Sequence, residues 1–363
     1  MVELVVRSES LHAWDAVSVT GDHPHFGPWH AAGRRLEWID GAFRTRLELP
    51  RGTRLNYLFV RGNWRHVEHA ENGLESRPHE LIVEPGLRIE HEIAGWGRDA
   101  VRYHPDVPSK YLPHPRTIAV HLPPGYDLHP LQRYPVVYLH DGQNLFDRHT
   151  AFAGVTWNCD DTADRLARSG EIRPVIQVGL GNTPDRLNEY GPTREGDDLA
   201  EAYARAIIAE IKPMIDREYR TRPGPRSTGV AGSSMGGLIS LHLARQHPSV
   251  FGLCAALSPS LWWDDAAILH DCLRDPRGLR TAALWIDMGG HEGFSDSGRR
   301  ANLDRTRALF EAARTWPEGR CHYLEVPEGL HNESAWAARY PDVLRFLLPS
   351  SRMVERRSEG LSA

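Results

Sequence analysis

The spacing of hydrophobic and polar positions changes part-way along the chain. Up to about residue 98, short apolar and β-branched runs alternate with turn signals such as Gly21-Asp22 and Asp40-Gly41. Runs of this length between such breakers are typical of strands. The predicted strands are Leu4–Arg7, Ala16–Thr20, Phe43–Leu49, Arg54–Val60, Glu80–Val83 and Arg88–Ile93. Several short strands at this spacing predict a small all-β sandwich over residues 1–98.

From residue 116 onward, apolar strand-like runs alternate with longer helical patterns. The predicted strands are Thr117–Leu122, Pro135–Leu139, Val175–Leu180, Thr228–Ala231, Gly252–Leu257, Ala283–Met288 and Cys321–Val326, and the predicted helices are Asp197–Tyr219, Met235–Gln246, Arg299–Ala313 and Glu333–Phe346. This alternation predicts an α/β domain over residues 116–349, with a mostly parallel sheet covered on both faces. Residues 99–115, rich in proline and histidine, are predicted to be a linker, and the polar residues 350–363 a disordered tail.

Composition narrows the class of protein. The length of 363 residues agrees with two domains, and a formal net charge of −5 gives no reason to expect nucleic acid or an acidic membrane as partner. No run approaches the roughly 18 apolar residues of a membrane span, and we expect no secretory signal. The cysteines Cys159, Cys254, Cys272 and Cys321 are scattered, which fits a reducing cytoplasm. The histidines are dispersed, so we expect no metal site.

The segment Gly232-Ser-Ser-Met-Gly236 has the spacing G-x-S-x-G. In this motif the serine lies on a cramped strand-to-helix turn, where larger residues at the glycine positions would collide with the neighbouring backbone. Here the segment follows an apolar strand and precedes a helical pattern, which is the context that the motif requires. Ser234, at the central position, is therefore the predicted nucleophile.

A serine nucleophile needs a base, and the base needs an orienting acid; in this strand-to-helix context they follow the serine in the order acid, then histidine. His331 lies in a loop between the last predicted strand and the last predicted helix, so it is the predicted base. The acid should follow the preceding strand. Glu292, in the loop beyond that strand, is favoured, and Asp287, within the strand, is the alternative.

Acyl transfer also requires donors that face the oxyanion of the tetrahedral intermediate. The backbone N–H of Met235, next to the nucleophile, is one predicted donor. The apolar strand predicted over Pro135–Leu139 is broken at Gly142, which frees the amide of Gln143 as the second predicted donor.

The catalytic half, from about Arg116 to Leu348, resembles the esterase branch of the α/β-hydrolases, which includes enterochelin esterases, S-formylglutathione hydrolases, feruloyl esterases and the mycobacterial antigen 85 acyltransferases. The matching segments are Leu122–Tyr126, His140–Asn144, Arg186–Tyr190, Gly232–Gly237, Ser258–Trp263, Gly289–Glu292 and Leu330–His331. The resemblance implies an α/β-hydrolase fold, with Glu292 as the acid, Gln143 as the second oxyanion donor, and no metal or organic cofactor.

The resemblance further implies a serine esterase that cleaves a small-molecule ester through an acyl-serine intermediate. Arg186, Trp262 and Trp263 are the expected substrate-binding residues, although the two tryptophans would equally suit core packing. Enterochelin-like siderophore esters are the favoured substrates. Feruloyl or acetyl esters on sugars are the alternative, and a non-catalytic carbohydrate-binding scaffold is the rival class.

The N-terminal half resembles the starch-binding sandwich (carbohydrate-binding families 20 and 48) over about 90 residues. The similarity rests on Trp29, Trp64, the segments around them and the closing Trp96. An exposed indole ring can stack on the apolar face of a sugar, so the resemblance implies a glycan partner. The alternative, which we favour, is that these tryptophans anchor turns in the core of the sandwich.

Overall fold

The computed structural model describes residues 1–62, 64–70, 75–96, 101–196, 198–275, 279, 283–315 and 320–350. The chain divides into two compact units. The first comprises Met1–Ala100, Leu122–Gln132 and Asp160–Ile172, and the second comprises Val101–His121, Arg133–Cys159 and Arg173–Ala363. The tail predicted to be disordered lies, from residue 351 onward, outside the described residues.

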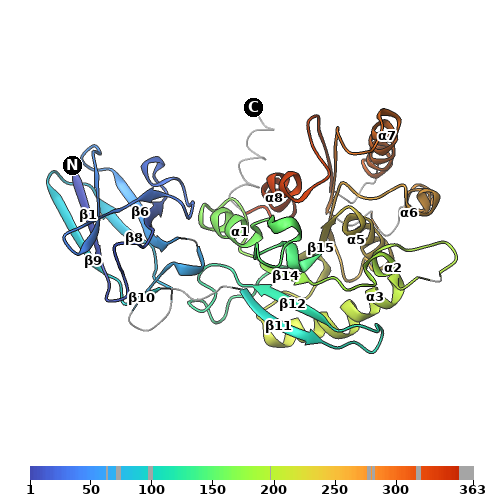
Figure 1. The fold of residues 1–363 in the computed structure, drawn as a ribbon, viewed down its shortest axis with the longest axis horizontal. Coiled ribbons are helices and arrows are strands. Elements are labelled where there is room, and N and C mark those ends of the chain that lie inside the picture. The colour runs from blue at the N-terminus through green and yellow to red at the C-terminus, as the bar shows by residue number, and fades with distance from the viewer. Residues whose placement is uncertain are drawn as a thin grey trace. The chain divides into compact units, whose positions relative to one another are not determined.

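The first unit is built on β-sheets (Figure 1). One sheet has the order β4-β5-β1-β9 and the other β3-β2-β6-β8, while β7 and β10 form a short pair. The strands are β1 (Val2–Arg7), β2 (Val17–Gly21), β3 (Arg34–Arg35), β4 (Glu37–Ile39), β5 (Ala42–Leu47), β6 (Arg54–Arg61), β7 (Glu68–His69), β8 (His79–Ile82), β9 (Leu87–Glu92) and β10 (Gly95–Trp96). Leu4 and Phe43 from one sheet share a core with Val19 and Phe59 from the other. The predicted all-β region is thus confirmed.

The predicted sugar-stacking tryptophans belong to a second apolar cluster in this unit. Trp29 is 7% exposed and Trp64 is 3% exposed, and they lie in a cluster with Leu58, Val60 and Val67. The guanidinium of Arg168 covers the Trp64 ring at 4.2 Å from its centroid. Stacking on a sugar needs an exposed ring face, so that interpretation is wrong for both residues, and the core interpretation holds.

The second unit is organised around a mostly parallel sheet. Among the described residues it has eight strands in the order β11-β12-β14-β13-β15-β16-β17-β18. β11 and β12 are antiparallel to their neighbours, and all pairings from β14 to β18 are parallel. Every residue of β13 to β17 is buried, as expected for strands covered on both faces. The strands are β11 (Val101–Val107), β12 (Arg116–His121), β13 (Val136–His140), β14 (Ile176–Leu180), β15 (Thr228–Ser233), β16 (Leu253–Leu257), β17 (Ala283–Gly289) and β18 (Arg320–Val326).

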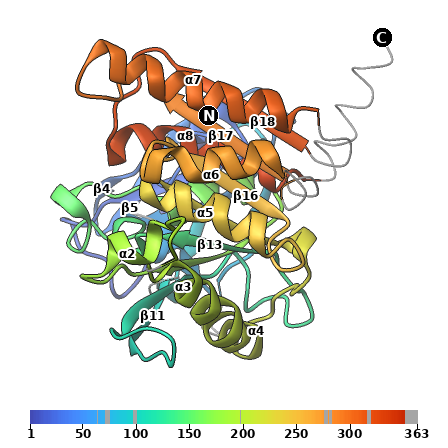
Figure 2. The same cartoon turned by 90° about the vertical axis from the view of Figure 1, so that its right-hand side faces the viewer.

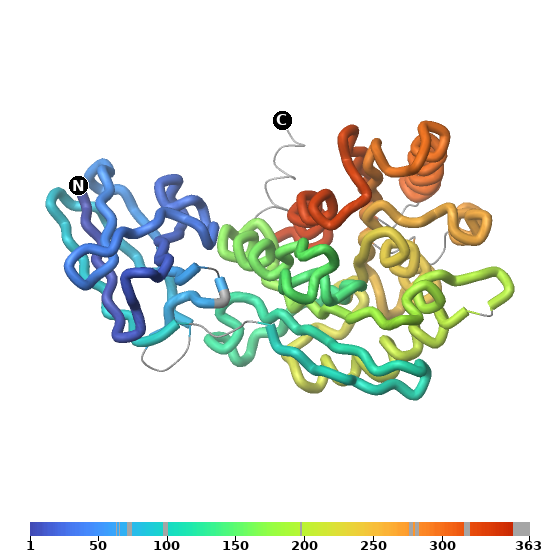
Figure 3. The backbone as a smooth tube through the Cα atoms, viewed as in Figure 1, coloured from blue at the N-terminus to red at the C-terminus, as the bar shows by residue number. Residues whose placement is uncertain are grey.

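The edge strand β11 corrects the linker predicted over residues 99–115. Residues 101–107 pair with β12 and form the long hairpin seen in Figure 3. Most side chains of β11 are exposed, so the strand lacks an apolar pattern. Pro105 lies where the pairing register shifts between His104 and Val107, because proline has no N–H to donate to the ladder. Because of these two features, the sequence pattern of this edge strand is the one expected of a linker.

Helices cover the sheet and bring its loops into place. They are α1 (Cys159–Arg168), α2 (Arg186–Tyr190), α3 (Ala200–Ala206), α4 (Lys212–Glu218), α5 (Met235–Gln246), α6 (Trp263–Arg274), α7 (Asp296–Ala313) and α8 (Glu333–Leu347). α5 packs on β15 and β16, α8 on β16 and β17, and α7 on β17 and β18. α6 lies beside α5 and α7 (Figure 2). In the part of the chain that the structure describes, none of the helices is long and apolar enough to cross a membrane.

Candidate active site

The turn between β15 and α5 holds Ser234 in a strained backbone conformation. Its φ of 56° and ψ of −121° are rare for a residue with a side chain. Hydrogen bonds fix the turn: the Ser234 N–H donates to the Leu257 carbonyl at 3.0 Å, and the Ser234 carbonyl accepts from the Ser260 N–H at 3.1 Å. The turn therefore projects the serine side chain at the carboxyl edge of the sheet.

The glycines of the motif allow this turn to close. A Cβ on Gly232 would lie 2.8 Å from the carbonyl carbon of Gly236, and one on Gly236 would lie 3.2 Å from the His140 Cβ. The side chain of any other residue at position 232 would force strand and helix apart, so the motif glycines have the steric role that the sequence predicts.

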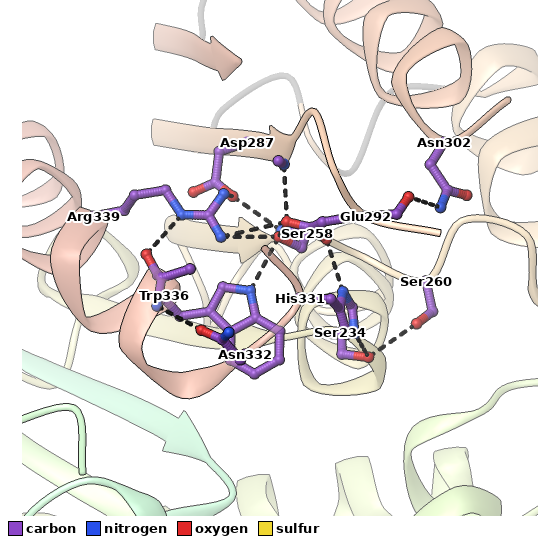
Figure 4. Close-up of polar contacts among 12 residues, drawn as sticks. Ser234, Ser258, Ser260, Asp287, Glu292, Asn302, His331, Asn332, Trp336 and Arg339 are labelled. Atoms are coloured by element: carbon purple, nitrogen blue, oxygen red, sulfur yellow. Dashed lines mark hydrogen bonds and ion pairs between the residues drawn. The ribbon is translucent and has the colours of Figure 1, made fainter. Parts of the chain in front are cut away.

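Ser234, His331 and Glu292 form a continuous chain of hydrogen bonds, drawn in Figure 4. The His331 Nε2 lies 2.9 Å from the Ser234 Oγ, and the His331 Nδ1 lies 2.7 Å from the Glu292 Oε2. The ring of Trp336 meets the imidazole edge to face, with 4.9 Å between ring centroids. The structure thus brings together the three residues that the sequence predicted as nucleophile, base and acid.

Asp287, the alternative acid, is engaged elsewhere. Its carboxylate accepts from Arg339 Nη1 at 2.8 Å, from the Ser258 N–H at 3.0 Å and from Trp285 Nε1 at 2.7 Å. Burial raises the pKa of the Asp287 carboxyl to about 6, against the opposing effects of Arg339, Trp285 and the Ser258 N–H. None of its hydrogen bonds among the described residues reaches His331, so the geometry favours Glu292 as the partner of the imidazole.

The two predicted oxyanion donors lie on adjoining turns. Met235 is the first residue of α5, so its N–H has no acceptor within the helix. Gln143 lies in the short 3-10 turn Gly142–Asn144 after β13. A Cβ on Gly236 would lie 3.2 Å from the His140 Cβ, which shows how closely the serine turn approaches the end of β13. The role of both amides as oxyanion donors stays a prediction.

Arg186 braces the turn that carries Gln143. Its guanidinium donates to both carboxylate oxygens of Asp141, at 2.6 and 2.7 Å, and the Asn182 side chain donates to the same carboxylate at 2.7 Å. Asp141 itself has a left-handed backbone conformation, with φ 56° and ψ 49°. The bidentate pair therefore gives Arg186 a structural task next to the site, and its contact with substrate stays a prediction.

The segment Ser258–Trp263, which follows β16, supplies serine residues to the site as well as the two tryptophans that the sequence predicted. Trp262 is 52% exposed, whereas Trp263 is half-buried, and its ring packs so close to Gly191 that a Cβ there would lie 2.8 Å away. Sequence reasoning missed Ser260, whose Oγ lies 3.3 Å from the Ser234 Oγ.

Sequence reasoning also missed Ser258 and Arg339, which contact Glu292, and Trp336, whose indole N–H donates to Ser258. Ser258 and Ser260 lie in Ser258–Trp263, one of the segments that carry the resemblance to known esterases, whereas the sequence around Arg339 contains no recognisable motif.

No group of three or more His, Cys, Asp and Glu side chains in the described residues could hold a metal ion. None of the four cysteines forms a disulfide bond within the described residues.

The geometry agrees with what known proteins show. Residues 109–347 match the family described as Putative esterase, which covers more than half of the chain. The chain belongs to this esterase family.

Relatives of this esterase include enzymes named for siderophore and feruloyl esters. It is 31% identical over 150 residues to the iron(III) salmochelin esterase of Escherichia coli O6:H1, an alignment that covers 41% of this chain and 33% of the relative. It is 26% identical over 212 residues to the endo-1,4-beta-xylanase/feruloyl esterase of Xylanibacter ruminicola, covering 57% and 27%. The chain thus spans about a third or less of these two relatives. Protein YbbA of Bacillus subtilis is 25% identical over 210 residues, covering 55% and 78%.

Solved structures show the same fold for this esterase. The enterobactin esterase of Shigella flexneri, solved in the presence of enterobactin, has a TM-score of 0.56 at 15% identity, covering 94% of this chain and 89% of that one. A ferulic acid esterase has a TM-score of 0.54 at 22% identity, covering 68% and 97%. At these identities the likeness concerns the fold, and it confirms the predicted α/β-hydrolase fold preceded by a β-sheet region.

Proposed function

We propose that this esterase hydrolyses carboxylic esters through an acyl-serine intermediate on Ser234. The observation that carries the proposal is the chain of two hydrogen bonds from the Ser234 Oγ through His331 to Glu292. A serine hydroxyl is a weak nucleophile unless a base takes its proton, and a base works best when a third group holds its ring in place. The site supplies both groups, with the nucleophile on a turn that exposes it.

The reaction proceeds in two halves. The Ser234 Oγ attacks the ester carbonyl carbon while its proton passes to the His331 Nε2, and the N–H groups of Met235 and Gln143 stabilise the oxyanion. Collapse of the tetrahedral intermediate breaks the bond to the alcohol, which leaves with the proton from Nε2. Water then gives a proton to Nε2 and attacks the acyl-serine carbonyl carbon; the bond to the Ser234 Oγ breaks, the Oγ takes the proton back from Nε2, and the carboxylic acid is released. Glu292 balances the charge of the imidazolium in both halves.

Esters of bulky aromatic acids are the substrates that the surface supports best. Several large apolar side chains are at least 50% exposed, and three of them are close in sequence to residues of the site. Leu187 follows Arg186, Phe294 lies two positions after Glu292, and Leu330 precedes His331. Trp262 and Phe152 belong to the same group. Exposed apolar side chains beside a site are available to contact an apolar ligand. Together with the relatives' names, they favour siderophore-type aryl esters first and feruloyl esters second.

The test is covalent labelling and turnover. A fluorophosphonate probe should modify the wild type at Ser234 and leave Ser234→Ala unlabelled. His331→Ala should lose about as much activity as Ser234→Ala, because the three residues act as a unit. A panel of catecholate siderophore esters, feruloylated sugars and short acyl esters then ranks the substrates. Persistent labelling of Ser234→Ala, or labelling at Ser233, would refute the assignment.

A further inference from the structure

A buried serine at the end of β16 connects the acid of the site to its surroundings. Ser258 is almost completely buried and has a φ of 44°, in the left-handed region that favours glycine. Its N–H donates to the Asp287 carbonyl at 3.1 Å and to the Asp287 Oδ1 at 3.0 Å, which fixes the residue against the end of β17. A residue other than glycine that is kept in a strained backbone conformation calls for a reason beyond packing.

The hydrogen-bond partners of the Ser258 hydroxyl determine where its proton points. The hydroxyl oxygen receives the indole N–H of Trp336 at 3.0 Å and the Nη2 of Arg339 at 3.1 Å. Indole and guanidinium nitrogens can only donate, so the hydroxyl accepts from both. Its single hydrogen is left for the third neighbour, the Glu292 Oε1 at 2.6 Å.

The same counting applies to Glu292. Its Oε1 accepts from the Ser258 hydroxyl and from the Gly289 N–H at 2.8 Å, and Arg339 Nη2 lies 3.5 Å away. A carboxylate has no hydrogen to donate and can only accept. The Oε2 is left for the His331 Nδ1, which must then carry the proton. The Nε2 of the neutral ring consequently has its lone pair directed at the Ser234 hydroxyl.

We infer that Ser258 is a positioning residue: its hydroxyl orients the Glu292 carboxylate so that His331 is held in the tautomer that accepts the Ser234 proton. The inference rests on the proposed function, since it assigns Ser258 to the support of that reaction. Figure 4 shows the hydroxyl at the centre of Glu292, Trp336 and Arg339. The hydrogen bonds of the Ser258 hydroxyl run to Glu292, Trp336 and Arg339, so its effect on the nucleophile passes through Glu292.

The position of Arg339 determines how removal of the Ser258 hydroxyl would affect Glu292. Its Nη1 is held by Asp287 at 2.8 Å, while its Nη2 donates to Ser258 and stays 3.5 Å from Glu292. Without the hydroxyl, Nη2 loses its acceptor and turns to Glu292, whose charge it then shares with the imidazole. The hold on the Nδ1 proton weakens, and the ring can adopt the Nε2–H tautomer, which cannot accept from Ser234.

Two variants test the inference. Ser258→Gly removes the hydroxyl and adopts the backbone conformation without strain, whereas Ser258→Ala removes the hydroxyl and keeps the Cβ. ¹⁵N-histidine NMR at pH 8 reads the tautomer, and His331→Gln assigns the His331 signals. We expect the Nδ1–H tautomer in wild type and a shift toward Nε2–H in both variants. kcat should fall about 100-fold with little change in KM, less than the roughly 10⁴-fold loss that a wholly wrong tautomer causes.

Ser240→Ala is the matched control. Ser240 is fully buried in α5, and its hydroxyl donates to the Gly236 carbonyl at 2.7 Å without contacting Glu292 or His331. This variant should keep the wild-type tautomer and kcat. Retention of the Nδ1–H tautomer in both Ser258 variants, whatever their activity, would overturn the inference. Because the tautomer is read without substrate, failure to find a hydrolysed ester would count against the proposed function and not against this test.

Discussion

At the scale of single residues, Glu292 and Asp287 show how two buried carboxylates in one network differ in what they do. Only Glu292 contacts the imidazole, and Asp287 is the ion-pair partner of Arg339. Glu292→Gln removes the charge opposite the imidazolium, so kcat should fall by about 10²- to 10⁴-fold while the fold is kept. Steady-state kinetics on an aryl ester, with urea unfolding as a check of integrity, measures this loss.

The companion variant Asp287→Asn should behave in the opposite way. It leaves the Arg339 charge buried with a neutral partner, and breaking a buried pair costs about 3–5 kcal/mol. We therefore expect a marked fall in the free energy of unfolding and only a modest change in kcat. If Asp287→Asn instead lowered kcat by the amount expected for Glu292→Gln and left the stability unchanged, the acid of the site would be Asp287 and not Glu292.

The sequence led to the residues of the site that carry a local signature and missed those that depend on the fold. Ser234 lies in a motif, and the order of strands led from it to Glu292 and His331. Arg339 meets Ser258 from a position 81 residues further along the chain, and arginine in a helix carries no mark of that contact. Only the packing of α8 against β16 and β17 brings the two together.

At the scale of elements, helix α5 holds a half-buried histidine, His242, that should make stability depend on pH. Burial lowers the pKa of His242 to about 4, from an ordinary value near 6.5. Between these values the unfolded chain binds a proton that the folded chain does not, so stability is present above pH 6.5 and is lost as the pH falls. The expected loss from His242 between pH 8 and pH 5 is about 2 kcal/mol.

His242→Leu should therefore reduce the difference in unfolding free energy between pH 8 and pH 5 by about that amount. The exposed His149 provides the control, because His149→Leu should leave the pH dependence as in wild type. Urea unfolding of the three proteins at both pH values gives the comparison. If His242→Leu showed the same pH dependence of unfolding free energy as wild type, the pKa of His242 would not be lowered in the folded chain.

The elements that the sequence predicted well are those with a strong periodic pattern. The buried strands of the central sheet and the long helices α5, α7 and α8 match the predicted ranges closely. Three helices escaped prediction. α2 is only five residues long, and α6 begins with Asp264, Asp265 and Ala266 at positive φ. α1, predicted as neither helix nor strand, follows directly after Asn158, which also has a positive φ. Short or irregular starts remove the pattern on which such predictions depend.

At the scale of the whole molecule, the first compact unit includes two segments that connect strands of the catalytic sheet, one between β12 and β13 and one between β13 and β14. The Arg168 of α1 covers Trp64 and pairs with Glu75 at 2.5 Å, and Glu75 also accepts the Gly125 N–H at 3.0 Å. These contacts tie segments 122–132 and 160–172 to the N-terminal sheets. They give Trp64 a structural role in place of the sugar-stacking role that its resemblance implied.

Trp64→Ala should accordingly lower stability and leave glycan retention unchanged. Removing a buried tryptophan costs about 3–5 kcal/mol, and here it also uncovers the Arg168 guanidinium. Trp14, which is 79% exposed, is the matched control, and Trp14→Ala should unfold at the same urea concentration as wild type. Retention on starch or glycogen should be equally weak for all three proteins.

Deletion of residues 1–98 should go further, because α1 then loses the residues that cover Arg168, and the exposed surface lowers solubility. A truncated chain as stable and active as the full one, together with glycogen binding that depends on Trp64, would restore the sugar-binding interpretation and move sugar esters ahead of siderophore esters as substrates.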